Sequence, residues 1–206
     1  MLIVGYKERK QKQKEEFKAE ILASALALFN EEGYAGFSMR KLAARIDHSP
    51  TTIYLYFKDK DDLLFHICEN LYAALYDKMQ EFRQMQLPPY ELLRAVYRHY
   101  IQYSLSHPEQ YKVVFFSNPH LYGPPEEYLA RDTMSSRCWK SICDVVDDCI
   151  QKGFFRPMES CTLSIVLWSA VHGLVSSLIF TKDFPMPSSE SMTEMLFEGL
   201  FNGYCA

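Results

Sequence analysis

Apolar residues recur at helical spacing along almost the whole chain, and no segment shows the strict alternation that is typical of strands. The pattern predicts about nine helices, separated by short segments that carry proline, glycine, serine or aspartate. We expect these helices at residues 8–32, 38–46, 50–57, 60–84, 90–106, 108–116, 126–152, 159–181 and 191–205. The predicted fold class is therefore all-α.

Capping and turn residues set the expected helix ends near the N-terminus. Gly33 is a natural stop for the first helix, and Ser38 can cap the second. Ser49 followed by Pro50 starts the third helix in the order of a cap and then a first-turn proline. Two short helices and a tight turn therefore follow one long helix.

The stretch Ser38 to Lys60, SMRKLAARIDHSPTTIYLYFKDK, is the most informative part of the chain. Its second short helix carries hydroxyls and tyrosines where most globular helices carry Glu and Lys, a composition that suits contact with phosphates and base edges. We expect residues 1–59 to form a helix-turn-helix DNA-binding domain and residues 60–206 to form a second, helical domain. The long helix at 60–84 would join the two.

Charge is spread unevenly along the 206 residues, whose net charge is −4. Residues 1–60 hold 11 lysines and arginines against 8 acidic residues, whereas the remainder holds 11 against 18. A local cluster of cations is enough to bind nucleic acid, so the N-terminal part can do so while the acidic body has another role. The leading segment KERKQKQKEEFK is either a frayed, solvated tail or a basic arm that lies against the DNA backbone.

Residues 161–180 contain no formally charged side chain and reach the length of a membrane span. Serine and histidine side chains make this segment a poor hydrocarbon solute, and no basic flank sets an orientation. We therefore favour a helix that meets the body's own core on one face and a second subunit on the other.

Small residues at helical spacing support this choice, because they allow another helix to approach closely. Two such helices from each of two subunits would form a four-helix interface. The predicted dimer interface comprises Ser169, Gly173, Ser176, Met192, Met195, Leu196, Gly199 and Gly203. The alternative is that these glycines only fit packing within one chain.

Other residue patterns narrow the functional class. The N-terminal run MLIVGY is too short for a secretory core, so we expect a cytoplasmic protein. The six cysteines show neither CxxC spacing nor a paired histidine motif, which favours reduced core thiols. The histidines lack metal-ligand spacing, and no nucleophile has a plausible local base. We expect no enzyme, no cofactor and no metal site.

Residues 21–64, ILASALALFNEEGYAGFSMRKLAARIDHSPTTIYLYFKDKDDLL, resemble the tetracycline-repressor (TetR) family of bacterial transcriptional regulators. The resemblance covers the helix, the Gly-x-x-Gly-Phe-Ser/Thr segment, the second helix, the turn, the Ser-x-x-x-Ile/Leu-Tyr-x-Tyr/His-Phe motif and the acidic-capped helix, in order. The body agrees in length and helicity. In addition, Trp168 followed by His172 and Gly173 resembles a body type found in part of the family.

Nine residues of the N-terminal part are predicted to contact DNA. Hydroxyls and amides in the first turn of the recognition helix would face phosphates, and Arg40 is the candidate for bidentate readout of a guanine edge. Tyr54 and Tyr56 either press their rings on sugars or thymine methyls or are half-buried in packing. The full set is Ser38, Arg40, Lys41, Ser49, Thr51, Thr52, Tyr54, Tyr56 and Lys60.

Two positions depart from the family pattern, which usually has Gly-Val in the turn before the recognition helix. Here the turn contains Asp47 and His48. Aspartate tolerates left-handed backbone better than most residues do, so the turn should survive at some cost. For His48 the sequence gives no role.

The resemblance also implies that residues 60–206 form a helical regulatory domain for ligand binding and dimerisation, with a ligand cavity among the fourth to eighth helices. Aromatic residues suit such a cavity, although at helical spacing they equally suit a plain core. The candidate ligand-binding residues are Tyr97, Tyr100, Tyr103, Phe115, Phe116, Trp139, Trp168 and His172.

The sequence as a whole predicts a ligand-responsive repressor. It would bind a palindromic double-stranded DNA operator as a homodimer, and an unidentified small apolar or aromatic effector would release it. The alternative is a DNA-bound interaction protein whose body recruits a protein partner and not a metabolite. No partner at a membrane is expected.

Overall fold

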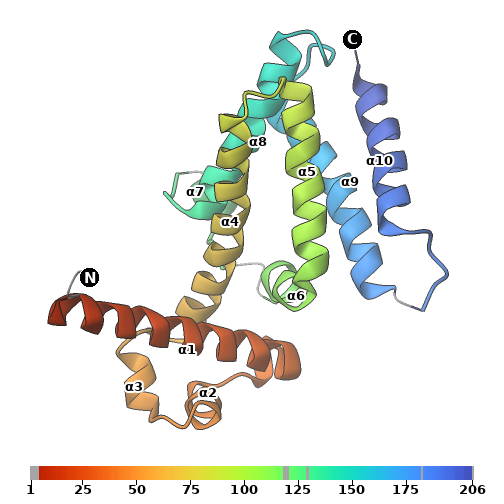
Figure 1. Ribbon diagram of the computed structural model, residues 1–206. Coiled ribbons are helices and arrows are strands. Elements are labelled where there is room, and N and C mark those ends of the chain that lie inside the picture. The colour runs from red at the N-terminus through yellow and green to blue at the C-terminus, as the bar shows by residue number, and fades with distance from the viewer. Residues whose placement is uncertain (1–4, 118–120, 129, 182, 206) are drawn as a thin grey trace. The chain divides into compact units, whose positions relative to one another are not determined.

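The computed structural model describes residues 5–117, 121–128, 130–181 and 183–205. The described residues form ten helices and one isolated backbone bridge, between Phe155 and Cys205 (Figure 1). Two compact units are present, Met1–Asn70 with Glu109–Pro125 and Leu71–Pro108 with Glu126–Ala206. The all-α prediction is confirmed.

The first unit contains the N-terminal helices and a segment from the middle of the chain. Large apolar residues from α1, α3 and α4 are fully buried in its core, among them Ile21, Ile53 and Leu63. Its elements are α1 (Tyr6–Gly36), α2 (Met39–Arg45), α3 (Pro50–Tyr54), the first part of α4 (Lys60–Gln84) and most of α6 (Pro108–Phe116).

The predicted stop at Gly33 is a break inside α1. Gly33 has φ +69° and ψ 174°, a backbone conformation that favours glycine, and one further helical turn follows it to Gly36. After the break, the ring of Phe37 stacks on that of Phe29 with centroids 4.1 Å apart. The break therefore turns the chain so that α2 begins beside the end of α1.

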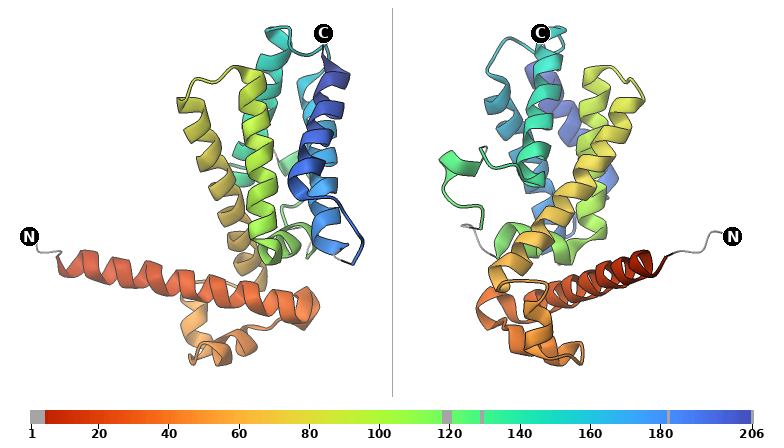
Figure 2. Two further views of the ribbon diagram at one scale, coloured as in Figure 1. Left: turned by 45° about the vertical axis from the view of Figure 1, so that its right-hand side comes forward. Right: turned by 90° about the vertical axis from the view of Figure 1, so that its left-hand side faces the viewer.

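The second unit is a bundle in which α5, α8, α9 and α10 run side by side (Figure 2). Its largest fully buried side chains include Tyr97, Phe155, Phe197 and Phe201. The bounds are α5 (Pro89–Ser106), α8 (Met134–Gln151), α9 (Ser160–Phe180) and α10 (Ser189–Tyr204), with the short α7 (Pro125–Tyr128) before α8.

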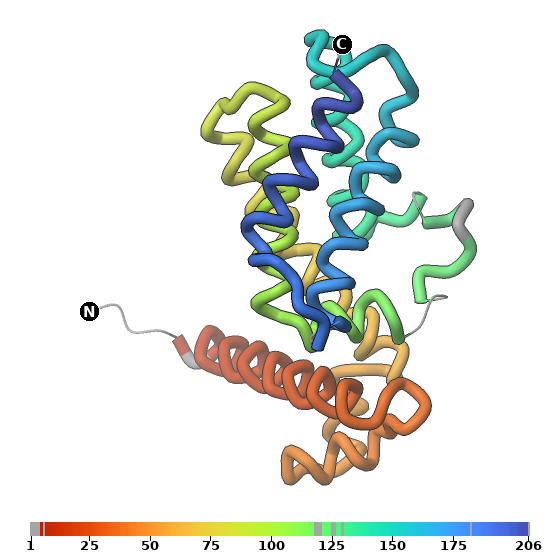
Figure 3. The backbone as a smooth tube through the Cα atoms, turned by 90° about the vertical axis from the view of Figure 1, so that its right-hand side faces the viewer, coloured from red at the N-terminus to blue at the C-terminus, as the bar shows by residue number. Residues whose placement is uncertain are grey.

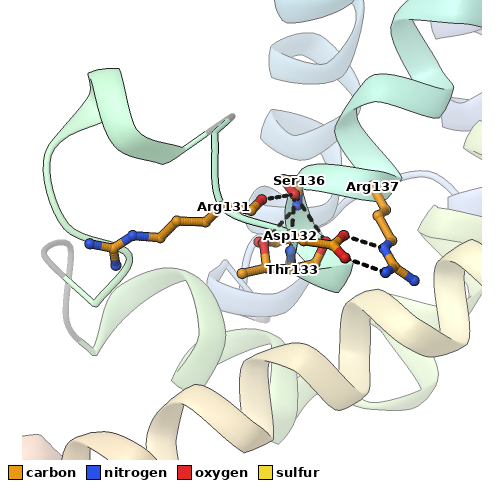
Figure 4. A network of polar contacts seen from close by, with 6 residues as sticks. Arg131, Asp132, Thr133, Ser136 and Arg137 are labelled. Carbon is orange, nitrogen blue, oxygen red and sulfur yellow. Dashed lines mark hydrogen bonds and ion pairs between the residues drawn. The ribbon is translucent and has the colours of Figure 1, made fainter.

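The prediction of one continuous helix over 126–152 is wrong, because α7 ends at Tyr128 and α8 begins at Met134. The hydroxyl of Thr133 accepts a hydrogen bond from the Ser136 amide, and that of Ser136 accepts one from the Thr133 amide, each at 3.2 Å. Asp132 forms two bonds of 2.6 Å with Arg137 just before the cap (Figure 4). These two side chains accept hydrogen bonds from amides that a continuous helix would pair with carbonyls. The reciprocal cap therefore interrupts the helix and begins α8.

The third helix is shorter than predicted, since α3 ends at Tyr54 and residues 55–56 form a turn. The amide of Phe57 still donates to the carbonyl of Ile53, so the segment stays closely coiled. Phe57 is buried, and this anchors the end of the turn.

Helix α9 is long and apolar enough to cross a membrane by length and composition alone. Within the second unit it packs against α5, α8 and α10. Leu163, Leu167 and Val171 are buried on one face, while Ile165 and Val166 are exposed on another. One face of α9 therefore belongs to the core of the second unit, and another apolar face is exposed among the described residues.

The six cysteines are free. Cys68 and Cys149 are buried, and burial raises the pKa of each thiol to about 12. Such thiols stay protonated and unreactive near neutral pH, as predicted for core thiols. Cys205 departs from that prediction because it is exposed.

Candidate nucleic-acid interface

Serine caps fix the starts of both short helices, α2 and α3. The Ser38 hydroxyl accepts a hydrogen bond from the Lys41 amide at 3.3 Å. The Ser49 hydroxyl accepts one from the Thr52 amide at 3.1 Å and lies 2.9 Å from the Thr52 hydroxyl. These bonds satisfy amides that helix starts leave unpaired, so both helices begin at defined residues.

Apolar contacts hold α3 against α2. Ile53, Phe57 and Leu42 are buried, whereas Ile46 is half-buried. Arg45 at the end of α2 forms a two-pronged pair with Glu31 of α1, at 2.5 and 2.7 Å. Hydrogen bonding to Arg45 lowers the pKa of Glu31. The helix pair therefore has both an apolar and an ionic attachment to α1.

The turn between α2 and α3 has the left-handed residue that the family pattern requires. Asp47 has φ +55°, so an aspartate occupies the position that glycine usually takes. The His48 amide donates to the Ala43 carbonyl at 2.9 Å, which closes the end of α2. The turn is thus preserved despite its unusual residues.

His48, for which the sequence gave no role, packs against α1. Its ring meets the Phe17 ring edge to face, with centroids 4.7 Å apart. Tyr56, on the other side of α3, meets the same ring at 5.2 Å. The Phe17 ring therefore contacts one residue just before α3 and one just after it, and holds both against α1.

The side chains left on the outer surface are those expected to read DNA. Arg40 and Thr51 are exposed, and Tyr54 is 54% exposed. Tyr56 is half-buried, in keeping with its contact with Phe17. Each of these side chains extends from a capped or anchored segment.

Two lysines that are predicted to contact DNA have partners within the chain. The Lys41 ammonium bonds to the Glu32 carboxylate and to the Gly36 carbonyl. The Lys60 ammonium lies 3.9 Å from the centre of the Tyr34 ring and donates to the Tyr34 carbonyl at 3.4 Å. Either lysine would have to exchange or share these contacts on binding phosphate.

Leu55 is a residue that sequence reasoning missed. It is 77% exposed at the end of α3, next to Tyr54. An exposed leucine beside a residue that is predicted to contact DNA suits contact with a thymine methyl group. The signal was available in its position, since it lies between two tyrosines on a segment whose inward positions are Ile53 and Phe57.

In the second unit, some candidate ligand residues come together. The Tyr100 hydroxyl lies 2.8 Å from Nδ1 of His172, and the Trp168 ring stacks on the His172 ring at 4.6 Å. Burial lowers the pKa of His172. Tyr97 is fully buried one turn before Tyr100 on α5. Tyr100, Trp168 and His172 thus form one aromatic cluster on α5 and α9, while the Tyr97 ring lies beside that of Phe201 of α10, with centroids 6.4 Å apart.

For the remaining candidates the structure describes other contacts. Phe115 and Phe116 belong to the first unit and pack around Tyr111, and Phe116 is 56% exposed. Tyr103 stacks on His107 at the end of α5. Trp139 lies half-buried on α8. Their roles in ligand binding stay predictions.

The residues predicted for the dimer interface lie on α9 and α10, which are neighbours in the second unit (Figure 3). None of them is buried: Ser169, Gly173, Met195, Gly199 and Gly203 are exposed, and Ser176, Met192 and Leu196 are half-buried. A Cβ atom built at Gly173, Gly199 or Gly203 would meet no atom of the described chain within 4 Å. Packing among the described residues therefore does not explain why glycine occupies these three positions.

Two family descriptions match the chain. "Bacterial regulatory proteins, tetR family" matches residues 21–67, and "Tetracyclin repressor-like, C-terminal domain" matches residues 93–201. The first match includes residues 38–60, which we call the recognition segment. The second covers α6 to α9 and most of α5 and α10.

Individual relatives agree with this assignment. The HTH-type transcriptional repressor NicS of Pseudomonas putida is 24% identical over 138 residues, which are 66% of this chain and 64% of NicS. The chain thus matches less than two thirds of that relative's length. The HTH-type transcriptional regulator HbdR of an Aromatoleum species is 24% identical over 187 residues, 90% of this chain and 78% of HbdR.

The solved structure of the fatty acid degradation regulator FadR from Bacillus halodurans superposes with a TM-score of 0.75. It is 16% identical, and the match covers 89% of this chain and 94% of FadR, so the likeness concerns the fold. Because one of the matching family descriptions alone covers more than half of the chain, the protein belongs to the tetracycline-repressor (TetR) family of bacterial transcriptional regulators, which are not enzymes.

Proposed function

We propose that this protein is a ligand-responsive repressor that binds a palindromic operator as a homodimer in the cytoplasm. The observation that carries the proposal is the outward placement of Arg40, Thr51 and Tyr54 on two capped helices whose apolar faces are buried. Rigid elements hold such side chains in one geometry, and a defined geometry is what readout of base edges requires.

In this proposal the nine predicted residues divide by role. Arg40 reads a guanine edge, Tyr54 and the neighbouring Leu55 contact sugars or thymine methyls, and the hydroxyls of Ser49, Thr51 and Thr52 face phosphates. Ser38, Lys41, Tyr56 and Lys60 complete the contact surface. The relative NicS is named a repressor, which supports repression as the outcome for this chain.

The exposed face of α9 and α10 is the proposed dimer interface. Gly173, Gly199 and Gly203 leave open space above the helix backbones, and Met195, which is 68% exposed, adds apolar surface between them. A second copy of the same face would fill that space by helix packing about a two-fold axis. Two recognition segments would then read half-sites about 34–36 Å apart, or a multiple of that spacing.

The aromatic cluster on α5 and α9 is the proposed effector site. The hydroxyls of Tyr97 and Ser104 share one face of α5 and are buried without a hydrogen-bond partner among the described residues. Buried hydroxyls ordinarily have a partner. An apolar effector with one or two uncharged polar groups would supply it, and His172, whose pKa burial lowers, would meet that effector as a neutral ring.

The effector would act by favouring a conformer in which α4 changes the spacing of the two recognition segments. A coupling free energy of about 1–3 kcal/mol is enough for a 5- to 150-fold loss of operator affinity.

The proposal is tested by selecting binding sites from a random-sequence DNA library and titrating the enriched duplex at several salt concentrations. We expect an enriched palindrome and an affinity that falls steeply with salt, because contacts with phosphates release counterions. Equal affinity for a scrambled duplex would contradict operator recognition. A body that captures another protein and responds to no small molecule would instead support the protein-recruiting alternative.

A further inference from the structure

Three lysines share one face of the N-terminal half of α1. At 3.6 residues per turn, Lys7, Lys10 and Lys14 fall within a sector of about 60° around the helix axis. The acidic residues Glu8, Glu15 and Glu16 fall on the other side of the axis, together with Arg9 and Lys12. One face of this stretch is therefore cationic, whereas the other carries charges of both signs.

The cationic face lines a groove. The groove encloses about 620 Å³. Its lining residues are Lys7, Lys10, Gln11, Gln13, Lys14, Phe17 and Tyr56. We call it the α1 groove. It reaches the recognition segment through Tyr56, whose ring contacts Phe17.

The lysines of the α1 groove are not used for packing or for ion pairs within the described residues. All three are exposed, and no described acidic side chain lies within ion-pair distance of their ammonium groups. Lys12, on the other face, does pair with Glu16 at 3.8 Å. Lysines near a helix start also oppose the helix dipole, so they weaken the helix that carries them.

We propose that the α1 groove binds the phosphate backbone of DNA next to the bases contacted by the recognition segment. This inference rests on the proposed function, because it takes the segment at residues 38–60 to be the reading element. Charge complementarity and continuity with Tyr56 support it. The three lysines extend over roughly 10 Å of helix, a length over which duplex DNA carries about six negative charges.

A contact with the phosphate backbone increases the affinity for DNA but not the specificity for particular bases. Phosphates carry no direct sequence information, so the α1 groove would lengthen the footprint and steepen the salt dependence. It would also favour one orientation of α1 on the duplex, because Phe17 joins the groove to both His48 and Tyr56.

The test compares two double variants that remove the same charge from opposite faces of α1. One variant combines Lys10→Gln and Lys14→Gln and so removes two positive charges from the α1 groove. The matched control combines Arg9→Gln and Lys12→Gln. Both pairs are exposed, so both proteins should keep the parent's thermal unfolding midpoint. Affinity is measured for a 40-base-pair random-sequence duplex and for the selected operator at several salt concentrations, where roughly 40 base pairs exceed any footprint of one dimer.

For the Lys10 and Lys14 variant, we expect the slope of log K against log salt to fall by about 1.8 for each subunit, and so by about 3.6 for the bound homodimer, on both duplexes, with unchanged preference among single-base operator variants. The control should shift the slope by far less. Equal slope changes in the two variants, or a groove variant that binds like the parent, would overturn the proposal. A library that yields no enriched site would count against the proposed operator recognition alone, since the random duplex still measures the α1 groove.

Discussion

The Tyr100 hydroxyl and Nδ1 of His172, 2.8 Å apart, join α5 to α9 inside the second unit. Tyr100 is 6% exposed, so its hydroxyl has little access to water. The Trp168 ring stacks on the imidazole, with centroids 4.6 Å apart. The contact thus ties the two helices at the centre of the proposed effector site.

Replacing Tyr100 with Phe should destabilise the protein by about 1 kcal/mol, because the imidazole nitrogen loses a hydrogen bond in a partly buried place. Urea unfolding followed by circular dichroism measures this change. Tyr54→Phe is the control, since Tyr54 is exposed and its change should stay within about 0.5 kcal/mol. Equal stabilities for Tyr100→Phe and the parent would show that the bond contributes nothing.

Stability should fall as the pH is lowered through the ordinary histidine range. Burial lowers the pKa of His172, and burial together with Lys18 lowers that of His66. The unfolded chain then binds more protons than the folded one, so the contribution of these groups is present above the unfolded pKa of 6.5 and is lost below it.

Thermal unfolding midpoints between pH 7.5 and pH 5.5, chosen to bracket the ordinary histidine pKa of about 6.5, measure this effect. His172→Asn and His66→Asn should each show a smaller drop than the parent, since asparagine does not titrate there. If neither variant flattens the profile, other groups cause the pH dependence.

Most of the fold follows from local patterns in the sequence. The helix at 60–84 is found with the predicted bounds because an acidic first turn and a long apolar stripe specify it. The break before α8 is caused by a pair of reciprocal hydrogen bonds between Thr133 and Ser136. The spacing of apolar residues does not reveal such hydrogen bonds, and for this reason the break was missed. A threonine three residues before a serine is too common a pattern to identify a cap by itself.

The candidate site was predictable in its inward residues and less so in its contacts. Ile53 and Phe57 are four residues apart, a spacing that indicates one shared helical face, and both are buried. The role of His48 depends on Phe17, 31 positions earlier in the chain, and no local pattern joins the two residues. The same holds for the α1 groove, whose lining combines α1 with Tyr56.

Asp47 offers a test of the turn. Its φ of +55° is costly for most residues, and least for glycine. Asp47→Gly should therefore leave stability within about 0.5 kcal/mol of the parent, whereas Asp47→Val should cost about 1–2 kcal/mol because a β-branched side chain clashes in this region. Urea unfolding gives both values. A valine variant as stable as the glycine variant would argue against a strained position.

The proposed dimer interface is tested with Gly199→Arg. The residue is exposed and a Cβ there meets nothing within the chain, so the monomer should fold normally. In the dimer the arginine would be buried without a partner, and we expect dimerisation to weaken at least about tenfold, which corresponds to 1.4 kcal/mol. Sedimentation velocity at several concentrations measures it. Gln102→Arg, at an exposed position of α5, is the control, and equal behaviour of the two variants would place the interface elsewhere.

Arg40 and Lys60 should affect DNA binding in different ways. Arg40 is exposed, and a two-pronged contact with guanine would contribute about 1–3 kcal/mol of discrimination, so Arg40→Ala should relax choice at one operator position. Lys60 lies over the Tyr34 ring, and a phosphate contact from it is independent of sequence. Lys60→Ala should weaken binding to all duplexes alike and reduce the salt slope by about 1 for each subunit, which is about 2 for the homodimer. Titrations of the selected operator and its single-base variants separate the two effects. Loss of base choice in the Lys60 variant with none in the Arg40 variant would reverse the assignments.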